Sequence, residues 1–262
     1  LDVCRTSMGS RLLARWLCQP LADKEAIIRR QEAVQTLTDQ FLMRETIGDC
    51  LSAMYDMDRL ATRIAYGSAS PRDVGQLGLS LKQIPALLEA ARPVTSWPEW
   101  QITSDCSGLQ KKIEDALIED LPLTMKDGGL FRDGYDSRLD ELRRLSADGN
   151  SFILDLEQRE RERTGVKSLK IGYNRVFGYY IDVRKGNLSA IKEEFGYIPR
   201  QTLANSTRFT TAELKEREDR ILSANDERIS LEASLFQDLL KEVESHLFEI
   251  HAAARTAAQI DA

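Results

Sequence analysis

The sequence predicts a mainly α-helical fold, with a helical core, two long antiparallel helical arms and a small β-rich domain inserted between the arms. Apolar residues recur at helical spacing over two long stretches, one from Ser137 to Gly165 and one from Thr211 to about Ile260. Between these stretches, short runs of aromatic and β-branched residues are separated by turn residues, which is typical of strands. An insert between two arms that share one core is the most economical architecture for this order.

The residues before the first arm predict the helical core. An apolar stripe from Met8 to Leu17 ends before Pro20, and Ser70-Pro71 combines a capping serine with a proline at the first helical position. The stretches Arg92 to Ser104 and Leu121 to Tyr135 contain proline or glycine, so we expect them to be irregular. The expected helices run from Met8 to Leu17, Asp23 to about Leu37, Asp56 to Ala65, Pro71 to about Ala91 and Asp105 to Ile118.

Both arms are predicted to be long helices. The first carries an apolar stripe that includes Leu139, Leu142 and Leu156, and Gly165 is suited to end it as a C-terminal cap. From Thr211 to about Ile260 the sequence has no proline and no glycine. We therefore expect a single helix of more than about forty residues there. We expect it to pack antiparallel to the first arm, because each arm has too little apolar surface to stand alone.

The insert is expected to contain four short strands and to be a domain of its own. The strands are predicted at Lys170 to Tyr173, Tyr179 to Val183, Tyr197 to Leu203 and Asn205 to Thr210, with a turn from Asn174 to Gly178. The chain thus divides into a core with the first arm (1–165), the β-rich insert (166–211) and the second arm returning to the core (212–262).

Charge is distributed unevenly along the chain. The net charge is −6, yet the insert holds eight Lys and Arg against three Asp and Glu, a net of +5. These cations alternate with aromatic residues, and the aromatics are explained by the core of a small domain. The cations themselves leave two readings open: contact with DNA phosphates, or a solvated basic surface.

The sequence contains no recognisable catalytic or metal-binding motif. Phosphate loops of the GxxxxGK[ST] type, GxGxxG and GxSxG are all absent. His246 and His251 are five residues apart, which does not match the HExxH spacing of a zinc helix. The chain has no CxxC pair, so we expect Cys4, Cys18, Cys50 and Cys106 to be buried, reduced thiols. We therefore assign no catalytic residue, cofactor or metal.

Two further features of the sequence suggest ordinary structural roles. From Glu157 to Arg163 the charges alternate in sign, which predicts a solvated helix face with a Glu157–Arg161 ion pair one turn apart. No apolar run approaches the ~20 residues that a membrane helix needs, and no signal peptide follows Leu1. We expect a cytoplasmic segment of a longer protein.

Several blocks of the sequence resemble the MutS family of DNA mismatch repair proteins, and the resemblance covers essentially the whole chain. The block Thr6 to Leu13 with Arg15-Trp16-Leu17 resembles the start of that family's core domain. The matching blocks that follow are Asp136 to Lys170, Ile171 to Val183 (IGYNRVFGYYIDV), Arg200 to Asn205 (RQTLAN), Arg208-Phe209 and Glu213 to Glu216. Their order and spacing are highly specific.

The resemblance implies a fold and a function. In the family, two long lever helices carry a β-rich clamp, and the clamps of two subunits close around duplex DNA and hold its backbone. Mismatch recognition and ATP hydrolysis belong to domains that this chain lacks, so we expect neither an enzyme nor bound ATP and Mg²⁺. The implied partners are duplex DNA, a second subunit and repair proteins such as MutL. By position, the resemblance assigns DNA binding to Lys170, Asn174, Arg175, Arg200, Asn205 and Arg208.

Two alternatives stay open at this point. In the first, the chain is a scaffold whose arms bind a partner protein or pass motion between domains. In the second, it is part of a MutS-like paralogue that binds branched DNA in recombination. Ala204 and Thr207 stand where some family members have charged residues, so the clamp is expected to use a different charge pattern.

Overall fold

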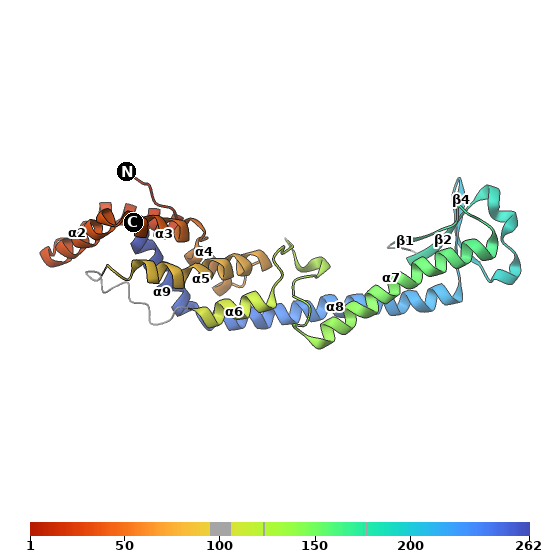
Figure 1. Ribbon diagram of the computed structural model, residues 1–262. Helices are drawn as coiled ribbons and strands as arrows, with labels where there is room; N and C mark the ends of the chain where they lie inside the picture. Colours follow the sequence, from red (N-terminus) through yellow and green to blue (C-terminus); the bar gives the residue numbers. More distant parts are fainter. Residues whose placement is uncertain (95–105, 123, 175, 177) are drawn as a thin grey trace. The chain divides into compact units, whose positions relative to one another are not determined.

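The computed structural model describes residues 1–94, 106–122, 124–174, 176 and 178–262, and it is mainly helical with one small antiparallel sheet (Figure 1). The predicted class, mainly α with a small β part, is therefore confirmed. The chain forms two compact units. Unit 1 comprises Leu1–Arg132 and Glu232–Ala262, and unit 2 comprises Asp133–Leu231, so that the boundary falls inside one long helix.

Unit 1 is built around the helix α5, which starts where the sequence predicts. Ser70 accepts a hydrogen bond from the backbone of Asp73, the Asp73 carboxylate accepts one from the backbone of Ser70, and Pro71 is the first helical residue. The side chains of Leu77 and Ile84 on this helix are fully buried. The helices of this unit are α1 (Ser7–Cys18), α2 (Lys24–Asp39), α3 (Phe41–Ser52), α4 (Met57–Ala65), α5 (Pro71–Ala91), α6 (Ser107–Ala116), the 3-10 turn η2 (Met125–Asp127), the part of α8 (Ala212–Glu244) from Glu232 on, and α9 (Leu247–Asp261).

All five predicted core helices are present, and α3 is an additional one. Asp23 and Asp56 cap α2 and α4, since each carboxylate accepts a backbone N–H three residues further on. Among its described residues, the stretch from Leu121 to Tyr135 is irregular as predicted, apart from the single turn η2 and a bridge between Phe131 and Leu117. The expected loop from Arg92 to Ser104 falls, from residue 95 on, outside the described residues.

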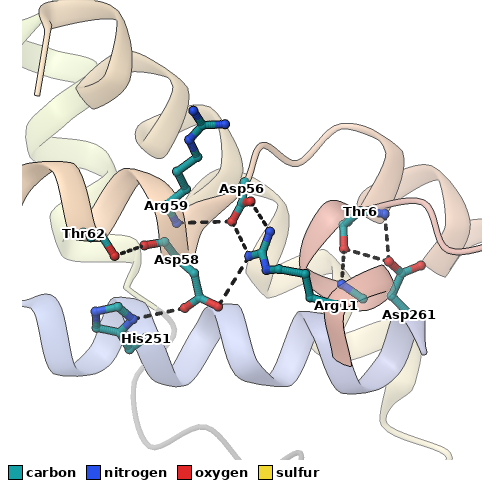
Figure 2. Close-up of polar contacts among 9 residues, drawn as sticks. Thr6, Arg11, Asp56, Asp58, Arg59, Thr62, His251 and Asp261 are labelled. Atoms are coloured by element: carbon teal, nitrogen blue, oxygen red, sulfur yellow. Dashed lines mark hydrogen bonds and ion pairs between the residues drawn. The ribbon is translucent and has the colours of Figure 1, made fainter. Parts of the chain in front are cut away.

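A polar network joins α1, α4 and α9 (Figure 2). The Asp261 carboxylate on α9 accepts hydrogen bonds from the backbone N–H and the hydroxyl of Thr6, at 2.8 and 2.7 Å. The Arg11 guanidinium on α1 donates to both carboxylate oxygens of Asp56, at 2.6 and 2.9 Å. His251 on α9 lies 3.1 Å from the Asp58 carboxylate on α4. Residues at opposite ends of the sequence thus fix the position of α1.

Unit 2 consists of two antiparallel helices and the sheet. The helices are α7 (Ser137–Thr164) and the part of α8 (Ala212–Glu244) that precedes residue 232. Their direction follows from two ion pairs: Arg138 to Glu227 at 2.6 Å and Arg159 to Glu213 at 2.7 Å. The predicted antiparallel packing is confirmed within this unit. Gly165, in the left-handed conformation, ends α7 as predicted.

The sheet has the strand order β1-β2-β4-β3, and every neighbouring pair is antiparallel. Each strand lies within two residues of its predicted limits. The strands are β1 (Lys170–Asn174), β2 (Gly178–Arg184), β3 (Ile198–Thr202) and β4 (Ser206–Thr210), and the 3-10 turns η3 (Lys185–Ala190) and η4 (Glu193–Phe195) join β2 to β3.

The prediction of one continuous helix after Thr211 is wrong. A turn at Ser245 and His246 separates α8 from α9. The Ser245 hydroxyl donates to the carbonyl oxygen of Glu242 at 2.7 Å, and the His246 Nδ1 lies 2.9 Å from the same oxygen. These side chains hold a carbonyl that would otherwise accept a helical N–H, so the helix ends without proline or glycine.

Two smaller predictions also need correction. Cys50 and Cys106 are buried as expected, but Cys18 is exposed and Cys4 is half-buried. Burial, followed by a hydrogen bond with Asp2, raises the pKa of the Cys4 thiol to about 11, so that thiol is protonated at neutral pH. The run Glu157 to Arg163 contains the predicted Glu157–Arg161 ion pair, at 2.6 Å, but the run is not simply a solvated face. Its other contacts attach the sheet to α7.

Candidate nucleic-acid interface

The two faces of the sheet differ in character. Ile181 and Val183 on β2 and Phe209 on β4 lie in the core of unit 2, together with Leu156 of α7 and Ile221 of α8. Because side chains alternate along a strand, Tyr180, Asp182 and Arg184 lie on the opposite, outer face. Any contact between this sheet and a ligand must therefore use the outer face or an end of the sheet.

Charged side chains of α7 attach the sheet through its backbone. The Glu157 carboxylate accepts the N–H of Ile171 at 2.6 Å, and the Arg161 guanidinium donates to the carbonyl of Leu169 at 2.7 Å. These bonds explain why the alternating charges fail to behave as a purely solvated face. The sequence feature that could have indicated this role is the position of the charged run from Glu157 to Arg163, directly before the insert.

A second attachment involves a buried carboxylate. Glu160 is buried and accepts hydrogen bonds from Arg163, at 2.7 Å, and from the Tyr197 hydroxyl, at 2.6 Å. Burial and the nearby Glu160 carboxylate both raise the pKa of Tyr197, so the phenol stays protonated and serves as a donor. Arg163 also lies 4.8 Å from the ring centre of Phe195. The segment between β2 and β3 is thereby fixed to α7.

The six residues assigned to DNA binding do not meet at one place. Lys170 and Asn205 lie at the end of the sheet where β1 and β4 begin, and both are exposed. Asn174 lies at the opposite end, where its side-chain oxygen accepts the N–H of Val176 at 2.8 Å. Arg175 lies outside the described residues. The antiparallel register, not the sequence, decides this separation.

Arg200 and Arg208 have contrasting environments. Arg200 is exposed on the edge strand β3, at a β-bulge that places it between the paired residues Pro199 and Gln201. Arg208 is half-buried and its guanidinium lies 4.1 Å from the ring centre of Tyr180. It also donates to the Gln201 side chain at 2.9 Å. The Arg208 guanidinium is therefore engaged by its neighbours within the sheet. Its partner in strand register is Asp182 on β2.

Three exposed cations that the resemblance did not single out lie near Lys170 and Asn205. Arg184 ends β2 and Lys185 begins η3, and the Lys185 N–H donates to the carbonyl of Asn205 at 3.0 Å. Lys167 adjoins Ser168, whose hydroxyl accepts a hydrogen bond from Asn187 at 3.0 Å. In the sequence, a basic pair directly after a strand was the available signal.

The described residues offer little else that resembles a site. They contain no group of three or more His, Cys, Asp or Glu side chains that could hold a metal ion. A groove of about 680 Å³ lies in unit 1 between α5, α6 and residues 117–122. Its cations are already paired: Lys82 with Glu114 at 2.7 Å, and Arg72 with the carbonyl of Leu121 at 2.8 Å. No helix among those described is long and apolar enough to cross a membrane.

The sequence of the chain matches a known protein family. The family model of MutS domain III matches residues 1–262, which is the entire chain. The chain belongs to the MutS domain III family.

Curated relatives agree with this assignment. The chain is 43% identical over its full length to the DNA mismatch repair protein MutS of Bacillus cytotoxicus and 45% identical to that of Geobacillus thermodenitrificans. It is also 43% identical to that of Desulforamulus reducens. The chain spans only 29–30% of the length of these relatives.

Proposed function

We propose that this chain is the part of a DNA mismatch repair protein that holds duplex DNA by its sugar-phosphate backbone. Support comes from the relatives, which are named DNA mismatch repair proteins. The observation that carries the proposal is the contrast between two groups of cations. Arg159, Arg161 and Arg163 on α7 are ion-paired, whereas Lys170, Arg184 and Arg200 on the sheet are exposed and make no ion pair with any described residue. Unpaired basic residues of this kind suit phosphate contacts.

The proposal also includes the parts of the longer relatives that this chain does not match. The relatives are more than three times as long, and their other parts would supply ATP and Mg²⁺ binding and mismatch recognition. In our proposal the chain has no enzymatic activity of its own. It encircles the duplex as one half of a homodimer and relays motion between DNA and the ATPase part. Proteins such as MutL would be its repair partners, and the cytoplasm its location.

Fluorescence anisotropy with labelled duplexes tests the proposal. We expect dissociation constants of about 10⁻⁴ to 10⁻⁶ M, with log affinity falling against log salt at about −0.9 per phosphate contact. Matched and mismatched duplexes should bind equally, because backbone contacts carry no base information. Absence of binding would favour the scaffold alternative. Tighter binding of a four-way junction than of a linear duplex would favour the recombination paralogue.

A further inference from the structure

The first arm of unit 2 is a continuous helix, yet its middle consists of residues that disfavour helices. Residues 146–151 of α7 read Ser-Ala-Asp-Gly-Asn-Ser, so only one of the six is a good helix former. Serine, aspartate and asparagine side chains compete with the helix for backbone hydrogen bonds, and glycine gains the most freedom when a helix opens. We call residues 146–151 the weak stretch of α7. On both sides of it, leucine, arginine and glutamate predominate, which are better helix formers.

The packing of α7 is also thinnest around the weak stretch. Leu139 and Leu142 are buried on one side of it, and Ile153 and Leu156 are buried on the other. Among the described side chains of residues 143–152, none is buried. Because packing of an apolar face supplies most of the stability of a helix in a protein, an opening at the weak stretch loses little of that stabilisation.

The second arm is similar at nearly the same level. The antiparallel packing places Ile221 of α8 directly against the backbone of Gly149, so that a Cβ on residue 149 would overlap the isoleucine side chain. Just beyond Ile221, residues 223–226 of α8 read Ser-Ala-Asn-Asp, which again contain only one good helix former. The two arms thus contact each other through glycine backbone at a level where both are poor in helix formers.

The part of unit 2 that carries the sheet has a hydrophobic core of its own beyond this level. The residues that α7 contributes to that core, Ile153 and Leu156, both follow the weak stretch. On α8, Ile221 is the core residue farthest along the helix, at the contact just described. The bond from Glu157 to the strand backbone also lies beyond the weak stretch. Opening of the weak stretch therefore leaves the sheet, its core and its attachments to α7 together as one body.

We propose that the arms of unit 2 contain a hinge at the level of Gly149 and Ile221. At this hinge the helical hydrogen bonds of the weak stretch open, and the part of unit 2 that carries the sheet tilts as one body. The contact between Ile221 and Gly149 is the pivot, because no side chain on residue 149 interlocks with the isoleucine. The hinge is independent of the proposed function, since it concerns the motion of the arms and not their ligand.

Hydrogen exchange of the 262-residue chain, followed by mass spectrometry, tests the hinge. After correction for intrinsic exchange rates, we expect the amides of the weak stretch to exchange at least about tenfold faster than those of residues 141–145 and 155–162. The strand β2 should exchange as slowly as these flanking parts of α7, because the sheet and its core remain closed while the weak stretch opens.

A pair of double variants tests the physical origin of the opening. Asp148→Ala with Ser151→Ala replaces two exposed, poor helix formers and should slow exchange in the weak stretch about three- to tenfold. Arg144→Ala with Gln158→Ala is the control, because both residues are exposed and already favour helices. It should change exchange in the weak stretch less than about twofold. Circular dichroism checks that both variants are folded.

Three results would overturn the hinge. The first is equal protection along the whole of α7 in the wild-type chain. The second is an equal effect of the Asp148/Ser151 variant and the control variant, because the opening would then not arise from poor helix formers. The third is exchange of β2 as fast as that of the weak stretch, because the sheet would then open with the arm and not tilt as one body. None of these results depends on whether the chain binds DNA.

Discussion

The carboxylate of Glu218 on α8 occupies the space in which a side chain at Gly178 would begin. Gly178 has a φ of 73°, a conformation that residues with a Cβ rarely adopt. Glu218 is only 3% exposed, and its carboxylate accepts the N–H of Tyr179. Helix α8 and the start of β2 thus approach this closely because residue 178 lacks a side chain.

Replacing Gly178 with alanine should destabilise unit 2. The added Cβ collides with the Glu218 carboxylate and meets an unfavourable φ, so we expect a loss of about 2 kcal/mol or more in the free energy of unfolding. Urea unfolding followed by circular dichroism measures the loss. Gly186→Ala is the control, because nothing lies within 4 Å of the Cβ that it adds. Equal stability of the two variants would contradict this account of Gly178.

Leu156 and Leu154 on α7 form a second matched pair. Leu156 is 1% exposed in the core of unit 2, and Leu154 is 70% exposed. Leu156→Ala should cost about 2–5 kcal/mol, since it removes buried methyl groups and leaves a cavity. Leu154→Ala should change stability by less than about 0.5 kcal/mol. Similar losses for both variants in urea unfolding would mean that α7 presents a different face to the core.

Asp261 should be important for the stability of unit 1 despite its position near the C-terminus. Its carboxylate accepts the N–H and the hydroxyl of Thr6 (Figure 2). It also accepts the N–H of Arg5. Asp261→Ala leaves these donors without their partner and should cost about 1–3 kcal/mol. Asp238→Ala is the control, because Asp238 only pairs with Lys241 on the surface. A thermal melt with no greater shift for Asp261→Ala would show that the network is dispensable.

The Arg11–Asp56 pair predicts a pH-dependent contribution to stability. The hydrogen bonds from Arg11 are the main reason that the pKa of Asp56 is lowered, although burial opposes them. A lowered folded-state pKa stabilises the fold above the ordinary aspartate pKa of about 3.9, and the gain disappears as the pH falls through the folded value. Arg11→Met should therefore cost up to about 1 kcal/mol near neutral pH.

The same variant should cost progressively less below about pH 4. Urea unfolding of wild type and variant across this range measures the difference. Arg59→Met is the comparison variant and should have a smaller effect, because Asp56 accepts a hydrogen bond from the backbone of Arg59 and only the charge of its side chain is lost. A difference between wild type and Arg11→Met that stays constant with pH would rule out this origin.

The sequence by itself determined the features that depend on neighbouring residues. The start of α5 follows from Ser70, Pro71 and Asp73, and the end of α7 follows from Gly165, because caps act within a few positions. The strand limits and the excess of cations in the insert were likewise visible, since alternation and composition are local properties.

Only the tertiary structure decided what joins residues far apart in the sequence. The register of β1, β2 and β4 placed Lys170 and Asn205 at one end of the sheet and Asn174 at the other. The carboxylates of Glu157 on α7 and Glu218 on α8 accept backbone N–H groups of the strands and so attach the sheet to these helices. The bonds of Ser245 and His246 to one carbonyl are local, but similar residues elsewhere in α8 leave the helix intact. Such outcomes depend on which donors and acceptors folding brings within about 3 Å of each other, and no local pattern encodes that distance.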